Sequence, residues 1–231
     1  MSFSNIPLFL LHQVDIDKYK IEIPKHLNEY NLCITGNIGV GKSTTLEFIK
    51  LILKLNKINI NLFPEYIQTE TGKLMFELFN GQKITPIVFQ NYILDNWIEL
   101  YDRYSKLIYT SFKINLYERF VEDSVKCFGK NSLNKSDYEY LLSRYNTENK
   151  NYHFLEYKEC EIVGVENDDI QKTIEDVINI INSDLKNNVK NRVVKLYTTV
   201  EKNEERIQQR NRHLENTCVD YNILNYYDEL A

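Results

Sequence analysis

The chain has 231 residues, of which 43% are hydrophobic and 26% are charged. This composition is typical of a globular protein of one or two domains and argues against an intrinsically disordered chain. The formal net charge of −5 makes a broad basic surface for nucleic acid unexpected. No apolar stretch approaches the roughly 18 to 20 residues that a membrane-spanning helix needs, and the four cysteines are scattered. We therefore expect a cytoplasmic protein with reduced thiols and with neither nucleic acid nor membrane as a partner.

A glycine-rich segment points to the class of ligand. The chain has only seven glycines, and three of them lie between residues 36 and 41. The apolar run 32–34 before this segment predicts a buried strand, and residues 42–57 after it predict a helix. The segment matches the pattern G-x-x-x-x-G-K-[ST] and consists of Gly36, Asn37, Ile38, Gly39, Val40, Gly41, Lys42, Ser43 and Thr44.

The chemistry of such a phosphate-binding loop follows from its backbone. Glycines let consecutive N–H groups converge on phosphate oxygens, and the helix that follows adds positive potential at its N-terminus. Lys42 is expected to reach the β- and γ-phosphates, and the Ser43 hydroxyl is expected to ligate Mg²⁺. The sequence therefore predicts a protein that binds ATP with Mg²⁺.

The other elements alternate between strands and helices along the chain. Apolar runs predict strands at 58–63, 114–117, 161–165 and 192–198. Periodicity and capping residues predict helices at 71–79, from Pro86 to about Ser111, from a capping box at 136–139, at 169–183, at 201–214 and from 220 onward, with a polar loop at 146–152. This order predicts an α/β fold with a parallel sheet of about five strands, flanked by helices on both faces.

Charged residues follow two of the predicted strands. Glu65 comes after the strand at 58–63, and the pair Glu118–Arg119 closes the strand at 114–117. Ligands of open α/β sheets bind beyond the carboxyl ends of the strands. Glu65 is therefore a candidate to accept the proton of an attacking hydroxyl, and Glu118–Arg119 a candidate to position Mg²⁺ and a phosphoryl group. An ordinary exposed glutamate and a surface ion pair are equally compatible with these residues.

Arginines cluster near the C-terminus. Arg206, Arg210 and Arg212 fall within seven residues of a predicted helix, where Arg206 and Arg210 share a face. A solvated basic face is the usual interpretation of such a cluster, but the chain otherwise prefers lysine. The planar guanidinium binds phosphate oxygens through two hydrogen bonds and stays charged, which favours a phosphate-clamping lid.

Together these segments resemble the deoxynucleoside kinase family. The resemblance is carried by the loop at 36–44, Pro64–Glu65, Phe89–Gln90, Glu118–Arg119 and the lid at 206–215. It implies a P-loop kinase fold over residues 31–231 as a single domain, preceded by an N-terminal extension at 1–30. It also implies transfer of the γ-phosphate of ATP to the 5′-hydroxyl of a deoxynucleoside, with Mg²⁺ as cofactor and a homodimer as the assembly.

The resemblance also assigns roles to individual residues. Glu65 would be the general base, with Lys42, Arg119, Arg206, Arg210 and Arg212 as the other catalytic residues. Glu118 and Ser43 would hold the metal. The deoxynucleoside would be bound by Glu65, Arg119, Gln90, Phe128, Phe79 and Glu215, of which Gln90 reads the base, Phe128 stacks on it, and Phe79 and Glu215 lie near the 3′-hydroxyl.

The sequence departs from the family pattern in two respects. Trp97, Phe120 and the pair Ser124–Val125 stand where the family often has an arginine, a serine and an Asp-Arg pair, with Asp123 adjacent. The family's last strand and helix normally follow the lid, whereas here the strand and helix at 161–185 precede it. We therefore expect a rearranged strand order, in which the strand at 161–165 fills the edge of the sheet beside the strand at 192–198.

Two alternative functions remain open. A nucleoside monophosphate kinase of the thymidylate kinase type shares the loop, lid and sheet, but it needs a further basic group for the phosphate of its acceptor. A catalytically reduced nucleotide-binding relative would be expected to carry a decayed loop, whereas the loop at 36–44 is intact.

Overall fold

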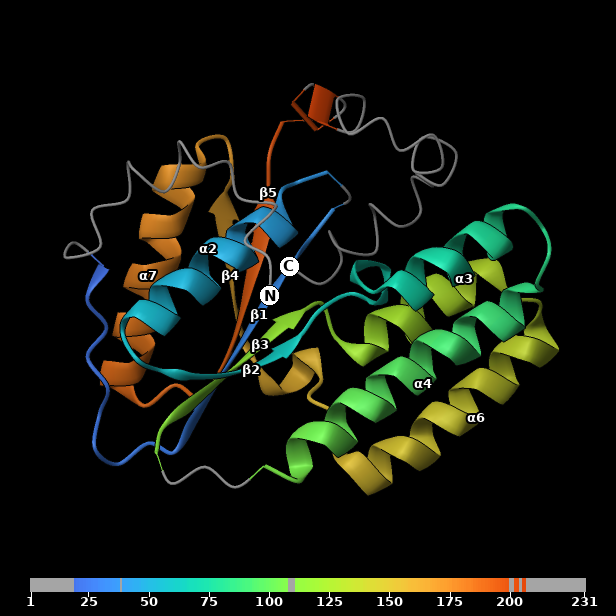
Figure 1. The fold of residues 1–231 in the computed structure, drawn as a ribbon, viewed down its shortest axis with the longest axis horizontal. Coiled ribbons are helices and arrows are strands. Elements are labelled where there is room, and N and C mark those ends of the chain that lie inside the picture. The colour runs from blue at the N-terminus through green and yellow to red at the C-terminus, as the bar shows by residue number, and fades with distance from the viewer. Residues whose placement is uncertain (1–18, 38, 108–110, 200–201, 204, 207–231) are drawn as a thin grey trace.

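The computed structural model describes residues 19–37, 39–107, 111–199, 202–203 and 205–206. These residues form a five-stranded sheet in the order β2-β3-β1-β5-β4, and every neighbouring pair of strands is parallel (Figure 1). The predicted α/β fold class is thereby confirmed. The strands are β1 (Glu29–Gly36), β2 (Asn59–Phe63), β3 (Lys113–Glu118), β4 (Glu161–Glu166) and β5 (Asn191–Tyr197).

Helices cover both faces of this sheet. The α-helices are α2 (Lys42–Leu55), α3 (Glu70–Asn80), α4 (Pro86–Ser105), α5 (Lys130–Ser132), α6 (Lys135–Tyr152) and α7 (Ile170–Asn187). Short 3₁₀ turns η2 (Tyr66–Gln68) and η4 (Tyr157–Glu159) and a π-helical segment η3 (Asp123–Gly129) complete the described elements. One hydrophobic cluster lies between the sheet and α2 and α7, and a second lies between the sheet and α4 and α6 (Figure 1).

The strand order explains which helix lies on which face. The connections β1–β2 and β4–β5 cross the sheet in one direction, and β2–β3 and β3–β4 cross it in the other. Crossover connections between parallel strands are almost always right-handed. This rule places α2 and α7 on one face and α3, α4 and α6 on the opposite face, as observed.

The expected rearrangement of the sheet is confirmed. β4 lies at the edge and pairs with β5 alone, in a register that sets Val165 opposite Leu196. β5 in turn lies beside β1, with Gly36 opposite Leu196. The chain therefore reaches the edge strand before it reaches the strand that leads to the predicted lid.

Three predicted boundaries were wrong. Residues 146–152 form the last turns of α6 rather than a loop, because Leu141 and Tyr145 anchor this helix in the core while Asn146 and Asn151 are exposed. Its N-cap is Asn134, whose side chain accepts a hydrogen bond from the Asp137 N–H, and not the Ser136 box. α4 ends at Ser105, well before Ser111, because the chain must turn to enter β3 at Lys113.

The described part of the N-terminal segment packs against the sheet layer. β1 begins at Glu29, before the boundary expected at residue 31, and Tyr19, Ile21 and Leu27 are buried in the first hydrophobic cluster. The Asn56 carboxamide binds this segment at two points, since it accepts from the Ile21 N–H at 3.0 Å and donates to the Tyr19 carbonyl at 3.0 Å. Residues 19–28 are therefore held against the end of α2.

Two further sequence expectations concern membranes and thiols. Among the described helices, none is both long and apolar enough to cross a bilayer. Cys33, Cys127 and Cys160 are free thiols.

A buried polar cluster joins α7 to the sheet. Asp184 is almost fully buried and accepts hydrogen bonds from the Tyr30 hydroxyl at 2.7 Å and from Nε of Arg192 at 2.8 Å. Burial and the neighbouring Asp184 raise the pKa of Tyr30, which keeps its hydroxyl protonated and able to donate. The cluster links β1, β5 and α7 through Tyr30, Arg192 and Asp184.

Removing this shared acceptor should destabilise the fold strongly. We expect Asp184→Ala to lower the free energy of unfolding by about 3 kcal/mol, because it leaves a mostly buried guanidinium with the exposed Glu161 as its remaining ion-pair partner. Tyr30→Phe should cost about 1 kcal/mol. Urea denaturation measures both, with Asn179→Ala on the exposed side of α7 as the control. An Asp184→Ala cost no larger than that of the control would contradict this role.

Candidate nucleotide-binding site

The glycine loop connects β1 to α2 at the carboxyl edge of the sheet. Gly36 has φ of 132°, and a Cβ there would lie 2.3 Å from the Leu196 carbonyl oxygen of β5. Gly41 has φ of 96° and is the N-cap of α2, so the free N–H groups of this helix face the loop. Val40 is buried, whereas Thr44 is exposed in the first turn. The two glycines thus adopt backbone conformations that suit glycine, and the described part of the loop leads directly into the N-terminus of α2.

Lys42 folds back over this loop. Its ammonium donates a hydrogen bond to the Asn37 carbonyl at 2.9 Å, and the residue is only 6% exposed. A lysine that neutralises the β- and γ-phosphates must curl over the loop in this way, because the phosphates lie within the ring of amides.

Ser43 and Glu118 form a candidate metal-binding pair. The Ser43 hydroxyl donates to Glu118 Oε1 at 2.7 Å, and the Gln68 carboxamide donates to the other oxygen of Glu118. Burial raises the pKa of Glu118, and the nearby Glu65 raises it further, whereas Lys42 and the Ser43 hydrogen bond oppose the shift. The carboxylates of Glu65 and Glu118 thus lie close enough to repel one another.

This pair fits Mg²⁺ as nucleotide enzymes hold it. Within the described ranges, no three His, Cys, Asp or Glu side chains cluster as a dedicated metal site would. Mg²⁺ at nucleotide sites commonly takes one or two protein oxygens and obtains its other ligands from phosphate and water. A hydroxyl and a buried carboxylate that are already in contact supply such oxygens.

Glu65 and Arg119 meet beside the loop, as their positions after β2 and β3 predicted. The two side chains form an ion pair, and NH2 of Arg119 lies 3.4 Å from the Gly36 carbonyl. Arg119 has φ of 66°, which is uncommon for a non-glycine residue, and its N–H donates to the Ile34 carbonyl at 3.3 Å. This backbone turn directs the guanidinium across the end of β1. The Glu65 carboxylate and the Arg119 guanidinium therefore lie together at the edge of the phosphate loop.

A second group of predicted residues continues from Arg119. The guanidinium carbon lies 5.2 Å from the centre of the Phe128 ring, and the Phe128 carbonyl accepts from the Ser132 hydroxyl at 2.7 Å. The Gln90 amide on α4 donates to the same serine at 3.3 Å. Gln90 is 5% exposed, and its Oε1 has no partner among the described residues. A buried amide oxygen without a donor costs about 1 to 3 kcal/mol, so it marks a position for a ligand.

Phe79, Trp97 and Phe120 pack against other aromatic rings. Phe79 on α3 stacks against Phe89 with ring centres 4.5 Å apart. Trp97 is buried and lies parallel to the Phe63 ring at 6.2 Å, and Phe120 packs edge-on against Tyr157 at 4.9 Å. The departures from the family pattern therefore replace polar groups by apolar packing.

Arg206 adjoins the loop from the opposite side. Its guanidinium donates to the Asn167 carbonyl at 2.8 Å and to the Val40 carbonyl at 3.3 Å. Ile38, Arg210, Arg212 and Glu215, which were also predicted to contribute, lie outside the described residues. The first arginine of the predicted lid is thus placed at the phosphate loop.

Two contributions were missed by sequence reasoning. Asn167 follows the edge strand and contacts the loop through its side chain. Asp123 accepts from the Phe120 N–H at 2.8 Å and from the Tyr157 hydroxyl at 2.7 Å, and that hydroxyl also lies 3.1 Å from Thr35 Oγ1. The sequence signal for Asp123 was its position beside Ser124, where the deoxynucleoside kinase family often has an aspartate. Tyr157 had no such signal in the sequence.

The buried Asp123 should make stability depend on pH. Burial raises its pKa from 3.8 to about 6, against the opposing effects of the Phe120 hydrogen bond and the Arg119 charge. The folded state therefore holds this proton more tightly, and stability falls as pH rises from about 4 to about 6. Asp123→Asn cannot titrate, so the stability of the natural protein relative to this variant should decline by about 3 kcal/mol over that range. Urea midpoints at several pH values measure this difference, and a difference that is constant or grows with pH would refute the assignment.

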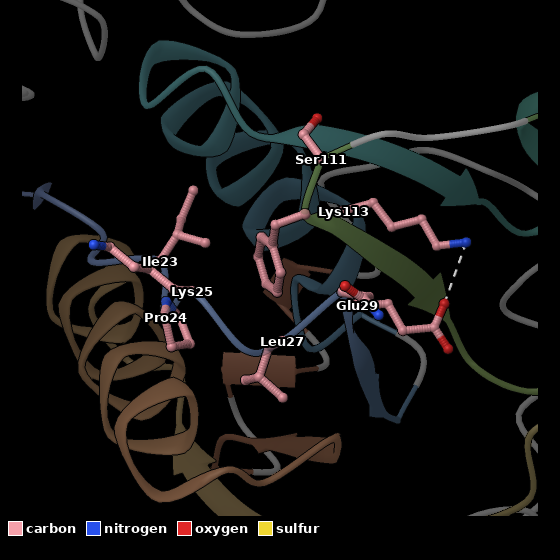
Figure 2. Close-up of a pocket in the computed structure, with 9 residues that line it drawn as sticks. Ile23, Pro24, Lys25, Leu27, Glu29, Ser111 and Lys113 are labelled. Carbon is pink, nitrogen blue, oxygen red and sulfur yellow. Dashed lines mark ion pairs between the residues drawn. The ribbon is translucent and has the colours of Figure 1, made fainter.

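A separate hollow lies at the opposite end of the sheet. It has a volume of about 590 Å³ and is lined by residues at the amino ends of β1 and β3, including Leu27, Phe112 and the ion pair Glu29–Lys113 (Figure 2). Because ligands of parallel sheets bind at the carboxyl ends of the strands, this hollow is not the nucleotide site.

Comparisons with known proteins leave the family unassigned. No protein-family model matches the sequence, and no curated protein is significantly similar to it. The fold is similar to a thymidylate kinase from Ehrlichia chaffeensis, with 14% identity, 79% of this chain and 98% of that chain covered, and a TM-score of 0.41. A thymidylate kinase from Candida albicans has 15% identity, 82% and 93% coverage and a TM-score of 0.40. These values are too low to carry an argument about function, which must rest on the site itself.

Proposed function

We propose that this protein is a kinase that transfers the γ-phosphate of ATP to the 5′-hydroxyl of a deoxynucleoside. The observation that carries the proposal is the position of the Glu65–Arg119 ion pair at the rim of the phosphate loop, beside Lys42, Ser43 and Glu118. A carboxylate beside a phosphate loop can act as a base and take the proton of an attacking alcohol, and an arginine next to it can bind phosphate oxygens.

The donor side uses the loop and its neighbours. The amides of the loop and the Lys42 ammonium would bind the phosphates, and Ser43 and Glu118 would hold Mg²⁺, which neutralises charge on the β- and γ-phosphates when it is bound. Arg206, with Arg210 and Arg212, would close over the transferred group. In phosphoryl transfer such positioning and electrostatic stabilisation supply most of the catalysis.

The acceptor side uses residues from α4 and η3. Gln90 would pair with the edge of the nucleobase through its unpartnered Oε1 and its amide, and Phe128 would stack on the base. Phe79 and Glu215 are proposed near the sugar 3′-hydroxyl, by resemblance alone. Arg119 would hold the Glu65 carboxylate toward the 5′-hydroxyl, so that the proton leaves as the oxygen attacks.

One observation also favours a second candidate function. The Arg119 guanidinium contacts Glu65 and the Phe128 ring, which are both proposed to bind the acceptor, so it could bind the phosphate of a nucleoside monophosphate. A thymidylate-type kinase would use it in this way. Labelled ATP with thymidine, the other deoxynucleosides and their monophosphates as acceptors separates the two functions, because only one acceptor class should be phosphorylated. ATP binding without transfer to any of these acceptors would indicate the catalytically reduced relative instead.

The assembly and location follow from the resemblance. We propose a cytoplasmic homodimer, which sedimentation of the purified protein and fractionation of its host cells would test.

Replacing the proposed base should abolish most of the turnover. We expect Glu65→Gln to lower kcat by about 10² or more, because the amide cannot accept the proton, while ATP affinity stays within about twofold. Steady-state assays with the preferred acceptor measure kcat, and equilibrium dialysis measures ATP binding. Glu70→Gln, an exposed glutamate at the start of α3, is the matched control and should behave like the natural protein. A near-normal kcat for Glu65→Gln would remove the assigned role.

Replacing the Gln90 amide should raise KM for the nucleoside without changing KM for ATP. We expect Gln90→Leu to raise KM for the nucleoside about tenfold or more, because paired hydrogen bonds to the base are lost, with KM for ATP unchanged. Its thermal stability without nucleoside should not fall, since the variant removes a buried oxygen that has no described donor. Gln171→Leu on the exposed side of α7 is the control. An unchanged nucleoside KM would place the base elsewhere.

A further inference from the structure

Asn167 joins three parts of the structure that are far apart in sequence. It follows β4, is 1% exposed, and its N–H donates to the Tyr197 carbonyl of β5 at 2.8 Å. Its side-chain Nδ2 donates to the Val40 carbonyl of the phosphate loop at 2.5 Å. Its Oδ1 lies 2.9 Å from the Thr173 hydroxyl, whose single proton is shared with the Glu166 and Asp169 carbonyls. Only the NH2 end of the carboxamide can donate to a carbonyl, so the contact with Val40 determines its orientation.

Arg206 reinforces the same contact. Its NH1 donates to the Val40 carbonyl at 3.3 Å, and its NH2 donates to the carbonyl of Asn167 itself at 2.8 Å. Two donors from outside the loop thus hold one loop carbonyl. The close approach also explains a glycine, since a Cβ on Gly41 would lie 2.5 Å from Nδ2 of Asn167. A guanidinium carries five N–H groups, so Arg206 keeps donors for a phosphate while it makes these contacts.

The held carbonyl determines where an amide points. The Val40 C=O and the Gly41 N–H belong to one planar trans peptide, in which they point in opposite directions. Holding the carbonyl outward, toward Asn167, therefore aims the Gly41 N–H into the loop. Rotation of this peptide changes ψ of Val40 and φ of Gly41, and Gly41, with φ of 96° and no side chain, offers little steric resistance to it. A flipped peptide would present a carbonyl oxygen to the phosphates and repel them.

We infer that Asn167 is a positioning residue, which keeps the Val40–Gly41 peptide oriented for phosphate binding and ties Arg206 to the same carbonyl. The inference rests on the proposed function only in that the ligand of the loop is ATP. It assigns to the edge strand a part in ATP binding that the pattern of the loop does not reveal.

The test is the ATP affinity of Asn167→Asp, measured by equilibrium dialysis with Mg²⁺ present. This isosteric change keeps the acceptor for Thr173 but replaces the donor to Val40 by a carboxylate oxygen. We expect the dissociation constant of ATP to rise at least tenfold, with KM for the acceptor within twofold of the natural value. Asn182→Asp on α7 is the matched control, because its amide also donates to a main-chain carbonyl, that of Lys20 at 3.1 Å, and should leave ATP binding unchanged.

Two further measurements separate positioning from simple destabilisation. In ¹H–¹⁵N spectra, ATP should shift the Gly41 amide of the natural protein downfield, and this shift should be lost in Asn167→Asp. Thr173→Val, which removes the hydroxyl beside Asn167 Oδ1, should weaken ATP binding in the same direction by a smaller factor. This variant replaces Asn167→Asp should that variant not fold. The inference would be overturned if Asn167→Asp bound ATP as tightly as the natural protein. The same holds for Thr173→Val if Asn167→Asp does not fold, and for a natural protein that does not bind ATP. A natural protein that binds ATP but phosphorylates no acceptor would overturn the proposed kinase activity alone, because the readout here is ATP affinity.

Discussion

The orientation of the main-chain peptides Gly36–Asn37 and Val40–Gly41 is the constraint on which the proposed nucleotide site depends. A loop can bind phosphate only if its N–H groups point inward, so its carbonyls must be satisfied outside. β1 lies inside the sheet, between β3 and β5, and both neighbours contribute to this arrangement. Arg119 reaches the Gly36 carbonyl from the side of β3, and Asn167 reaches the Val40 carbonyl from the side of β5 and β4. The same neighbours bring the charged groups that can act on a bound nucleotide.

The rearranged strand order has a structural consequence for this arrangement. Because β4 precedes β5, the turn that begins at Asn167 is complete before the chain reaches the predicted lid. The segment at the start of the predicted lid contacts that turn. Thr198 and Lys202 both donate to Asp168, and Arg206 donates to the Asn167 carbonyl. The β4–β5 connection crosses the sheet in the direction opposite to that of β3–β4. It therefore places α7 on the same face as α2, where the apolar side of α7 completes the first hydrophobic cluster.

Sequence patterns predicted those features whose signal is local or repeats along the chain. The loop, the start of a helix at Pro86, and the meeting of Glu65 with Arg119 at the carboxyl edge all follow from short motifs and from the geometry of parallel sheets. The helical structure of residues 146–152 was missed because composition suggested a loop, whereas burial of Tyr145 stabilises the helix. The role of Asn167 has no local signal, since its partner Val40 lies 127 residues away. The left-handed backbone of Arg119 likewise results from tertiary contacts.

The central claim is that Glu65 faces the alcohol of an acceptor held in line with the phosphate loop. It is tested most directly by a crystal structure of the protein with Mg²⁺, a non-hydrolysable ATP analogue and a deoxynucleoside. The account predicts that a carboxylate oxygen of Glu65 lies within about 2.6 to 3.2 Å of the 5′-oxygen, and that this oxygen lies in line with the γ-phosphorus. A deoxynucleoside bound away from Gln90 and Arg119, or a Glu65 side chain directed away from the 5′-oxygen, would contradict it.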